Sequence, residues 1–187
     1  MTRGVSIVSS CSPLSYYSKD DLRLIREANT YEELLVVALA VLAKMPPHIS
    51  MVCGPITTGG LGCVKKNLLK FDEAILMLAW RGENVFTQMP YEVAMQRIKE
   101  NKAYYKDGAQ LLWSFYYPIF ASGMITRLCF LPDWRTSGGA MWERERADEL
   151  GISCVEFCDN YEKIPFPGSL LKKPACELLN TQAELRY

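Results

Sequence analysis

The fold is decided by the stretch Leu131-Pro132-Asp133-Trp134-Arg135-Thr136-Ser137-Gly138-Gly139-Ala140-Met141-Trp142-Glu143. It continues an apolar, strand-like run at residues 125–131, passes through a polar turn, and enters a helical pattern that extends to Leu150. In open α/β sheets, ligands bind where the carboxyl ends of strands meet helix N-termini. The stretch therefore predicts a strand–helix unit with Glu143 in the first turn of its helix. The helix dipole would favour an ionised carboxylate there, a better nucleophile than acid.

The composition is that of an ordinary globular domain with balanced charge. The chain has 187 residues, 49% of them hydrophobic, with 21 Lys and Arg against 21 Asp and Glu. This balance argues against polymeric nucleic acid as a partner. The apolar stretch at residues 34–42 is too short to span a bilayer, so no membrane partner is expected either.

Seven cysteines and a single histidine limit the chemistry of any site. Cys53, Cys129 and Cys154 lie in apolar strand-like runs, and the scattered, odd-numbered set indicates buried free thiols in a reducing, cytoplasmic setting. The sequence has no CxxC motif, and His48 is alone, so a zinc site or a His-dependent triad is not expected. We therefore expect neither a metal nor a cofactor.

The first 46 residues predict a helical extension. Residues 1–17 are rich in Ser and have no clear period, apart from a short extended piece at 5–8. Helices are expected from Ser18 and after Thr30, where Glu33 completes a capping-box pattern. Pro46-Pro47 ends the second helix and marks the boundary with a main domain at residues 47–187.

The main domain alternates strands and helices. This predicts an α/β fold, Rossmann-like or flavodoxin-like, with a parallel sheet of four to five strands wound with helices on both faces. Strands are expected at 49–53, 84–86, 125–131 and 152–157, and helices at 64–81, 91–101, 107–121 and 139–150. After Cys158 the chain is loop-like, with weak helical character at 175–184.

Other loops are expected to meet Glu143 at the carboxyl ends of the strands. Gly54-Pro55-Ile56-Thr57 opens a Gly-rich turn, which lets backbone N–H groups approach an anion or a sugar. Its spacing matches neither the dinucleotide fingerprint nor a P-loop. Gln88 lies in the turn after the second strand, and Tyr116 and Tyr117 come near the crevice from an aromatic helix. The alternative for those aromatics is packing in the core or at a subunit interface.

Taken in order, these motifs resemble the nucleoside 2-deoxyribosyltransferase-like superfamily, and most closely a bacterial and phage branch of uncharacterised function. The resemblance covers about residues 50–157. It rests on Gly54-Pro55-Ile56-Thr57, Asn67, Leu131-Pro132-Asp133-Trp134, Ser137-Gly138-Gly139-Ala140-Met141-Trp142-Glu143, Ala147, Leu150 and Gly151.

The resemblance implies an enzyme in which Glu143 attacks the anomeric carbon of a sugar. Ser137, six residues earlier, would hold the sugar or its phosphate beside Gly139, as in the nucleotide N-glycosidase members. The Gly-Pro turn would lie under the base and ribose. Transferases of the superfamily carry an Asp in the helix before the third strand, which exchanges a proton with the leaving base. Here Tyr116 or Tyr117 stands near that place, and in several relatives a C-terminal segment reaches a neighbouring subunit's site.

The residue types agree with this chemistry. An oxocarbenium-like transition state needs a nearby carboxylate and a proton donor for the leaving base, without metal or histidine. Glu143 is the candidate nucleophile, Asp133 is the candidate acid or ribose ligand, and Trp134 could stack on a base. Each has a structural alternative: Glu143 could only offset the dipole, Asp133 could only form the turn, and Trp134 could belong to the core.

The leading expectation is cleavage, by hydrolysis or transfer, of the N-glycosidic bond of a nucleoside or nucleoside 5′-monophosphate through a covalent glycosyl-Glu intermediate. The alternatives are a non-catalytic nucleotide sensor, which the missing Asp favours, and a glycohydrolase acting on NAD. A homodimer or larger assembly is also expected. Residues 34–42 and 113–120 offer more apolar surface than one small sheet covers.

Overall fold

The computed structural model describes residues 12–57 and 59–157 of the chain. Its sheet has four parallel strands in the order β2-β1-β3-β4, formed by Asn84–Phe86, Ile49–Cys53, Ile125–Phe130 and Ser153–Glu156. This confirms the predicted parallel α/β sheet. Because the chain leaves β1 toward β2 and leaves β3 toward β4, β1 and β3 flank the switch point where such folds bind ligands.

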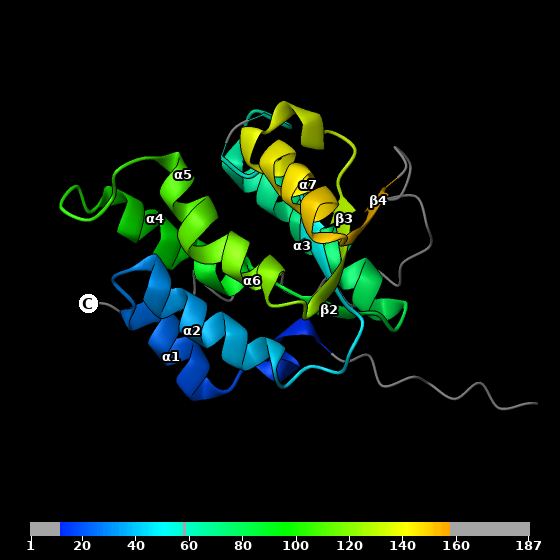
Figure 1. Cartoon of the computed structure of the whole chain (residues 1–187), viewed down its shortest axis with the longest axis horizontal. Helices are drawn as coiled ribbons and strands as arrows, with labels where there is room; N and C mark the ends of the chain where they lie inside the picture. Colours follow the sequence, from blue (N-terminus) through cyan, green and yellow to red (C-terminus); the bar gives the residue numbers. More distant parts are fainter. Residues whose placement is uncertain (1–11, 58, 158–187) are drawn as a thin grey trace, which may run out of the picture.

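Helices cover both faces of the sheet, as predicted (Figure 1). On one face, α3 (Val64–Trp80) packs against the β1 residue Val52 and the β2 residue Val85. On the other face, Met51 and Phe130 belong to a cluster that includes α4 (Glu92–Glu100) and α7 (Gly138–Leu150). Right-handed crossovers produce this division, because the β1–β2 connection runs in the opposite direction to the two that follow.

The two N-terminal helices begin at the predicted caps. Ser18 precedes α1 (Lys19–Glu27) and forms a capping box with Asp21. Thr30 precedes α2 (Tyr31–Leu42), and its hydroxyl accepts a hydrogen bond from the Glu33 N–H at 3.2 Å. The Glu33 carboxylate accepts from the N–H of Asn29 at 2.6 Å, one residue before the position that a capping box would use.

The N-terminal helices share one hydrophobic core with the sheet. Tyr31, Leu34, Ala38 and Val41 of α2 are fully buried in the cluster that also holds Phe130. Figure 1 shows α1 and α2 beside α4 and α6 (Tyr117–Ala121), in agreement with their residue contacts. The helices α1 and α2 precede the predicted boundary at Pro46-Pro47 in the sequence. Their apolar side chains nevertheless pack against residues that follow this boundary.

The predicted helix at 107–121 contains a π-helical turn. The helix α5 (Gly108–Leu111) leads into η3 (Leu112–Tyr116), where the N–H of Tyr117 bonds to the carbonyl of Leu112, five residues back. Pro118 lacks an N–H and crowds the preceding turn, which favours the wider turn there. The extra residue changes which aromatic side chains face inward, so that Phe115, Tyr116 and Phe120 are buried while Trp113 is 48% exposed.

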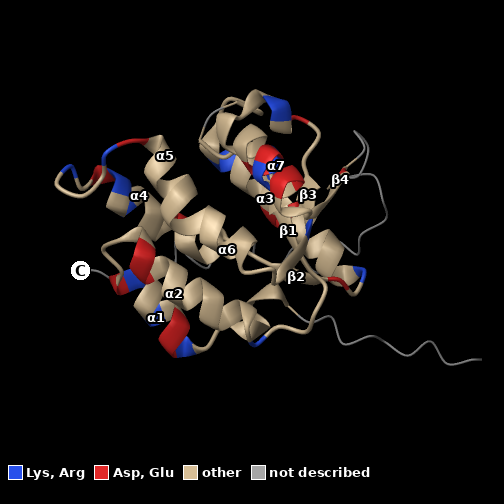
Figure 2. Ribbon diagram, viewed as in Figure 1, with Lys and Arg blue, Asp and Glu red and all other residues tan. Residues whose placement is uncertain are grey.

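The remaining helical elements are short 3-10 turns at chain junctions, at Pro13–Tyr16 (η1), Met89–Tyr91 (η2) and Trp134–Thr136 (η4). No helix of the described ranges is long and apolar enough to cross a membrane. Figure 2 shows Lys and Arg interspersed with Asp and Glu along α7. The extended piece predicted at 5–8 and the helical character predicted at 175–184 lie outside the described residues.

The cysteines differ among themselves. Cys53 and Cys129 are buried free thiols, as predicted. Cys154 is half-buried, and Cys63 is exposed at the N-cap of α3, so the expectation of burial is wrong for Cys63. Cys63 follows a glycine-rich turn rather than a strand, which leaves its side chain in solvent. The other three, Cys11, Cys158 and Cys176, lie outside the described residues.

Candidate active site

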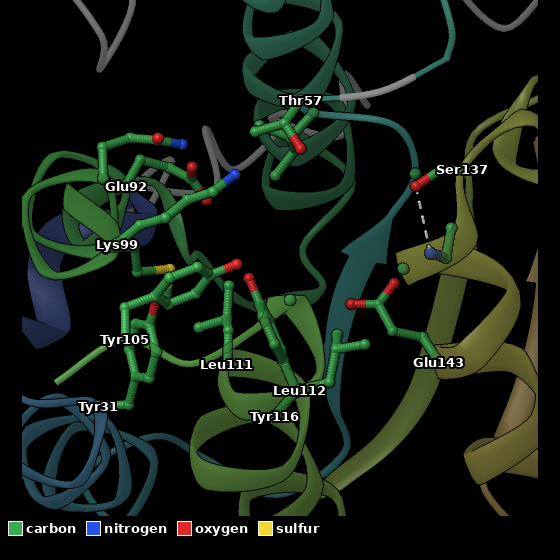
Figure 3. Close-up of a pocket in the computed structure, with 17 residues that line it drawn as sticks. Tyr31, Thr57, Glu92, Lys99, Tyr105, Leu111, Leu112, Tyr116, Ser137 and Glu143 are labelled. Carbon is green, nitrogen blue, oxygen red and sulfur yellow. Dashed lines mark hydrogen bonds between the residues drawn. The ribbon is translucent and has the colours of Figure 1, made fainter. Parts of the chain in front are cut away.

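A cavity of about 350 Å³ opens at the carboxyl ends of β1 and β3. Its walls come from the turn after β1, the start of α7, α4 and the α5–η3 segment, with Tyr31 from α2. Figure 3 shows Glu143 on one side, Glu92, Lys99 and Tyr105 on the other, and Tyr116 between them. The volume falls within the roughly 300–1,000 Å³ of small-molecule sites.

The turn after β1 contributes Gly54, Ile56 and Thr57 to the cavity, as predicted. Gly54 is required by close packing, because a Cβ atom there would lie 2.9 Å from Leu131 Cδ1. Pro55 is absent from the lining, and its ring faces the loop, where Pro55 Cγ would lie 2.7 Å from a Cβ on Gly60. The turn therefore presents backbone and small side chains to a ligand.

Asn67 on α3 holds this turn in place. Its Nδ2 donates to the carbonyl of Ile56 at 3.1 Å, and its Oδ1 accepts from the N–H of Leu61 at 2.9 Å. The N–H of Gly60 donates to Thr136 Oγ1 at 2.8 Å. These bonds join the loop after β1 to the loop after β3, so the two walls of the cavity are fixed relative to each other.

Ser137 and Gly139 line the cavity at the start of α7. Ser137 is the N-cap, and its Oγ accepts a hydrogen bond from the N–H of Ala140 at 3.4 Å. A hydroxyl that accepts still has its own O–H to donate. Ser137 therefore caps the helix and can also donate to a ligand oxygen.

Glu143 also lines the cavity, but from the second turn of α7. The predicted first-turn position is wrong, because α7 begins at Gly138. The side chain is 7% exposed, and burial raises its pKa to about 8. The Cys53 thiol lowers this pKa by hydrogen bonding, and the nearby Glu92 raises it. The predicted ionised state is thus wrong for the free protein, since desolvation outweighs any help from the helix dipole.

A second buried carboxyl group, Glu92, was missed by the sequence reasoning. Glu92 begins α4, is 9% exposed and faces the same cavity, and burial raises its pKa to about 7. The signal was present in the sequence. Glu92 follows β2 by a short turn, so it comes from the carboxyl end of a strand and the first turn of a helix, the two criteria applied to Glu143.

Three tyrosines form much of the opposite wall. Tyr116 from η3 is buried, which raises its pKa well above the ordinary value, and it lies with Tyr31 and Tyr105 along the lining. The sequence reasoning selected Tyr117 for the site, with Tyr116 as its alternative. Tyr117 lies outside the lining and packs on Trp113, with ring centroids 5.0 Å apart. The π-helical turn shifts the helix register by one residue, which explains why Tyr116 lines the cavity and Tyr117 does not.

Asp133 and Trp134 lie beside the cavity and do not line it. Asp133 lies under the Gly-rich loop, with Oδ2 3.1 Å from where a Cβ on Gly60 would stand. Trp134 packs on Phe130 with centroids 5.0 Å apart, and Arg135 covers its ring. Asp133 thus belongs to the turn and Trp134 to the core, which were the structural alternatives to a role in the site.

Gln88 also stands behind the wall of the cavity. It is 2% exposed, and its Nε2 donates to the carbonyl of Val52 at 2.9 Å. This bond ties the turn after β2 to the end of β1. Gln88 therefore supports the site and is not part of its lining.

Comparison with protein-family models, with curated proteins and with solved structures found no match. Within the described ranges, no group of three or more His, Cys, Asp or Glu residues could hold a metal ion. The chemistry of the cavity must therefore be argued from its own side chains.

Proposed function

We propose that the protein cleaves the N-glycosidic bond of a nucleoside or nucleoside 5′-monophosphate. The observation that carries this proposal is the pair of buried carboxyl groups in one cavity, Glu143 with a pKa of about 8 and Glu92 with a pKa of about 7. Buried acids without a cationic partner destabilise a fold, and such perturbed groups cluster in active sites. Their placement at the switch point adds a second, independent argument.

In the first step, an oxygen of the ionised Glu143 carboxylate forms a bond with the anomeric carbon. The C–N bond breaks, and its electron pair leaves with the base, which takes the proton of Glu92. The covalent sugar ester then reacts with water or another acceptor, whose proton returns to Glu92. Glu92 would thus supply the proton from α4, in place of the Asp that the resemblance expects in the helix directly before the third strand.

The competent state of the pair holds a single proton. Near pH 7–8 one of the two acids is ionised, and transfer of the remaining proton from Glu143 to Glu92 prepares nucleophile and acid together. The Cys53 thiol favours the ionised form of Glu143 by donating a hydrogen bond to it. Ser137 would donate to a sugar hydroxyl or phosphate oxygen beside Gly139.

One observation favours a second candidate, a nucleotide sensor without turnover. With a pKa of about 8, Glu143 is mainly protonated at neutral pH, and a neutral carboxyl group binds ligands but does not attack carbon. The two candidates differ in whether a base is released.

A single screen separates these candidates. Thermal shifts are recorded with nucleosides, nucleoside monophosphates and NAD, and each mixture is then analysed by chromatography for free base. Base release by the wild type and none by Glu143→Gln supports the enzyme. A thermal shift without base release in any mixture supports the sensor.

The proposal also covers the localisation and the oligomeric state of the protein. We extend it to a cytoplasmic homo-oligomer, because Cys53 and Cys129 are free thiols and because Val36 (69% exposed) and Trp113 (48% exposed) remain on the surface. Most apolar side chains of α2 are buried within the chain, which reduces the surface available to a partner copy. Light scattering at micromolar concentration tests the assembly.

A further inference from the structure

The cavity continues past Glu143 to a far end built by α4 and by the start of α2. We call this end the leaving-group subsite and define it by Tyr31, Glu92, Lys99 and Tyr105, all of which line the cavity. Figure 3 shows these four side chains together on the side opposite Glu143. Neither the resemblance nor the sequence motifs assigned any of these residues.

The start of α2 is held firmly at this subsite. The N–H of Tyr31 donates to the hydroxyl of Tyr104 at 3.1 Å, and that hydroxyl donates to the Glu32 carboxylate at 2.6 Å. The Tyr31 side chain is 0% exposed, and its hydroxyl has no hydrogen-bond partner among the residues that the structure describes. A buried hydroxyl without a partner costs free energy, so one that lines a cavity points to a ligand atom.

The other polar groups of the subsite can also donate hydrogen bonds. Glu92 carries a proton below a pKa of about 7, and its neutral carboxyl group donates one hydrogen bond. Lys99 stands exposed at the rim, and neither residue has an ion-pair partner within residues 12–57 and 59–157. The subsite therefore presents an ammonium and a carboxyl O–H to its occupant, and the unpartnered hydroxyl of Tyr31 is buried in its wall.

The walls between these groups suit a flat ring. Met95, Tyr105, Leu111, Leu112 and Tyr116 surround the space with apolar and aromatic surface. Aromatic side chains stack on planar bases with little regard to sequence or substituent. Shape alone therefore admits any nucleobase, and selection must come from the polar groups.

We propose that the leaving-group subsite binds the departing base and selects nucleobases that carry a carbonyl where a related base carries an exocyclic amino group, so that hypoxanthine is preferred to adenine and uracil to cytosine. This inference rests on the proposed function for the identity of the occupant as a base. Donors in the subsite meet carbonyl oxygens as acceptors, whereas an exocyclic amino group would place a donor against Lys99.

The same groups would assist bond cleavage. As the C–N bond breaks, its electron pair spreads onto the carbonyl oxygens of the base. The Lys99 ammonium stabilises that negative charge, and the proton of Glu92 moves to the base and completes the neutral product. Recognition and leaving-group activation thus use one set of side chains.

The test measures binding of free bases, which needs no bond cleavage. Calorimetry on the full chain at pH 6.5 compares hypoxanthine with adenine. We expect hypoxanthine to bind about tenfold more tightly, and Tyr31→Phe and Lys99→Met each to remove most of that preference. Tyr91→Phe, at a fully buried tyrosine outside the lining, and Lys102→Met, at an exposed lysine beyond α4, are the matched controls and should preserve it.

The possible outcomes distinguish a failure of the proposed subsite from a failure of the proposed function. Equal or tighter binding of adenine, no binding of either base at millimolar concentration, or equal losses in the controls overturns the subsite. A Lys99→Met variant that weakens only nucleoside monophosphates assigns Lys99 to phosphate and also overturns it. If the preference and its loss are seen while no nucleoside is cleaved, the subsite stands and the proposed function fails.

Discussion

The carboxyl groups at the two ends of the sheet lie in opposite environments. Before β2, at the amino end, Glu83 accepts hydrogen bonds from Ser50 at 3.0 Å and from Arg127 at 3.1 Å, in a polar hollow. At the carboxyl end, Glu92 and Glu143 are buried without an ion-pair partner among the residues that the structure describes, and their pKa values rise to about 7 and about 8. A partly exposed ion pair adds a little stability, whereas an unpartnered buried carboxyl group costs stability, and this cost is why we propose a role for the pair in chemistry or ligand binding.

The largest expected effect is on catalysis at the carboxyl end. Glu143→Gln removes the nucleophile and keeps the shape, so base release should fall by roughly 10⁴–10⁶-fold. Glu83→Gln at the amino end should retain wild-type activity. Chromatography of released base measures both variants. Turnover by Glu143→Gln at the wild-type rate would remove the distinction between the two ends.

Glu92 should matter through its proton. Glu92→Gln should lower base release from a neutral nucleoside by roughly 10²–10⁴-fold, the usual contribution of a general acid. The base of a purine nucleoside methylated at N7 leaves without being protonated. With such a nucleoside, Glu92→Gln should therefore lose far less activity than with a neutral nucleoside.

The pH dependence follows from the same two groups. Activity needs one ionised and one protonated acid, so kcat/KM in the wild type should be bell-shaped with a maximum between about pH 7 and 8. In Glu92→Gln the fall on the alkaline side should disappear. An unchanged profile in that variant would mean that another group donates the proton.

Stability should change in opposite directions at the two ends. The folded pKa of Glu143, about 8, exceeds the ordinary value of 4.5, so stability contributed by the neutral group is complete below pH 4.5 and is lost as pH rises through 8. Glu143→Gln should therefore match the wild type near pH 4.5 and exceed its free energy of unfolding by up to about 5 kcal/mol above pH 8. Denaturant titrations across this pH range measure the difference.

The matched substitution at the amino end should be destabilising. Glu83→Gln breaks a partly exposed ion pair with Arg127, so it should lower the free energy of unfolding by about 0.2–1 kcal/mol. If both variants lost stability at pH 9, the buried carboxyl group of Glu143 would not carry the cost assigned to it.

The smallest effect is expected at Ser137. Ser137→Ala should weaken ligand binding by roughly 0.5–3 kcal/mol, and more for a 5′-monophosphate than for its nucleoside if the hydroxyl meets phosphate. Because Ser137 caps α7, the variant should also lose about 1 kcal/mol of stability. Binding and unfolding measured on the same preparation separate the two effects.

The sheet could be predicted from sequence, because its signals are local. The runs 49–53 and 84–86 are bounded by turn residues, and both strands have the predicted bounds. Ser137 was recognised as a site residue, but its capping role starts α7 at Gly138 and moves Glu143 to the second turn. The predicted ionised state of Glu143 was wrong because the local sequence does not show the burial that raises its pKa.

The site depends on relations that no local pattern contains. Glu92 and Glu143 meet only because strand order brings β2 and β3 to either side of β1. Tyr116 replaces Tyr117 because Pro118 follows a π-helical turn. The pKa values depend on desolvation, which requires the packed structure, and Tyr31 reaches the cavity from a helix that the sequence assigned to an extension.

The most direct test of the central claim is the mass of the Glu143 peptide during turnover. Glu92→Gln is mixed with an N7-methylated nucleoside, quenched in acid and digested. This variant should release the methylated nucleobase, but it lacks the Glu92 carboxylate that helps water attack the sugar ester, so the ester should accumulate. We expect the peptide that contains Glu143 to gain the mass of the sugar as free base appears. Release of base with that peptide unmodified at every quench time would contradict a covalent role for Glu143.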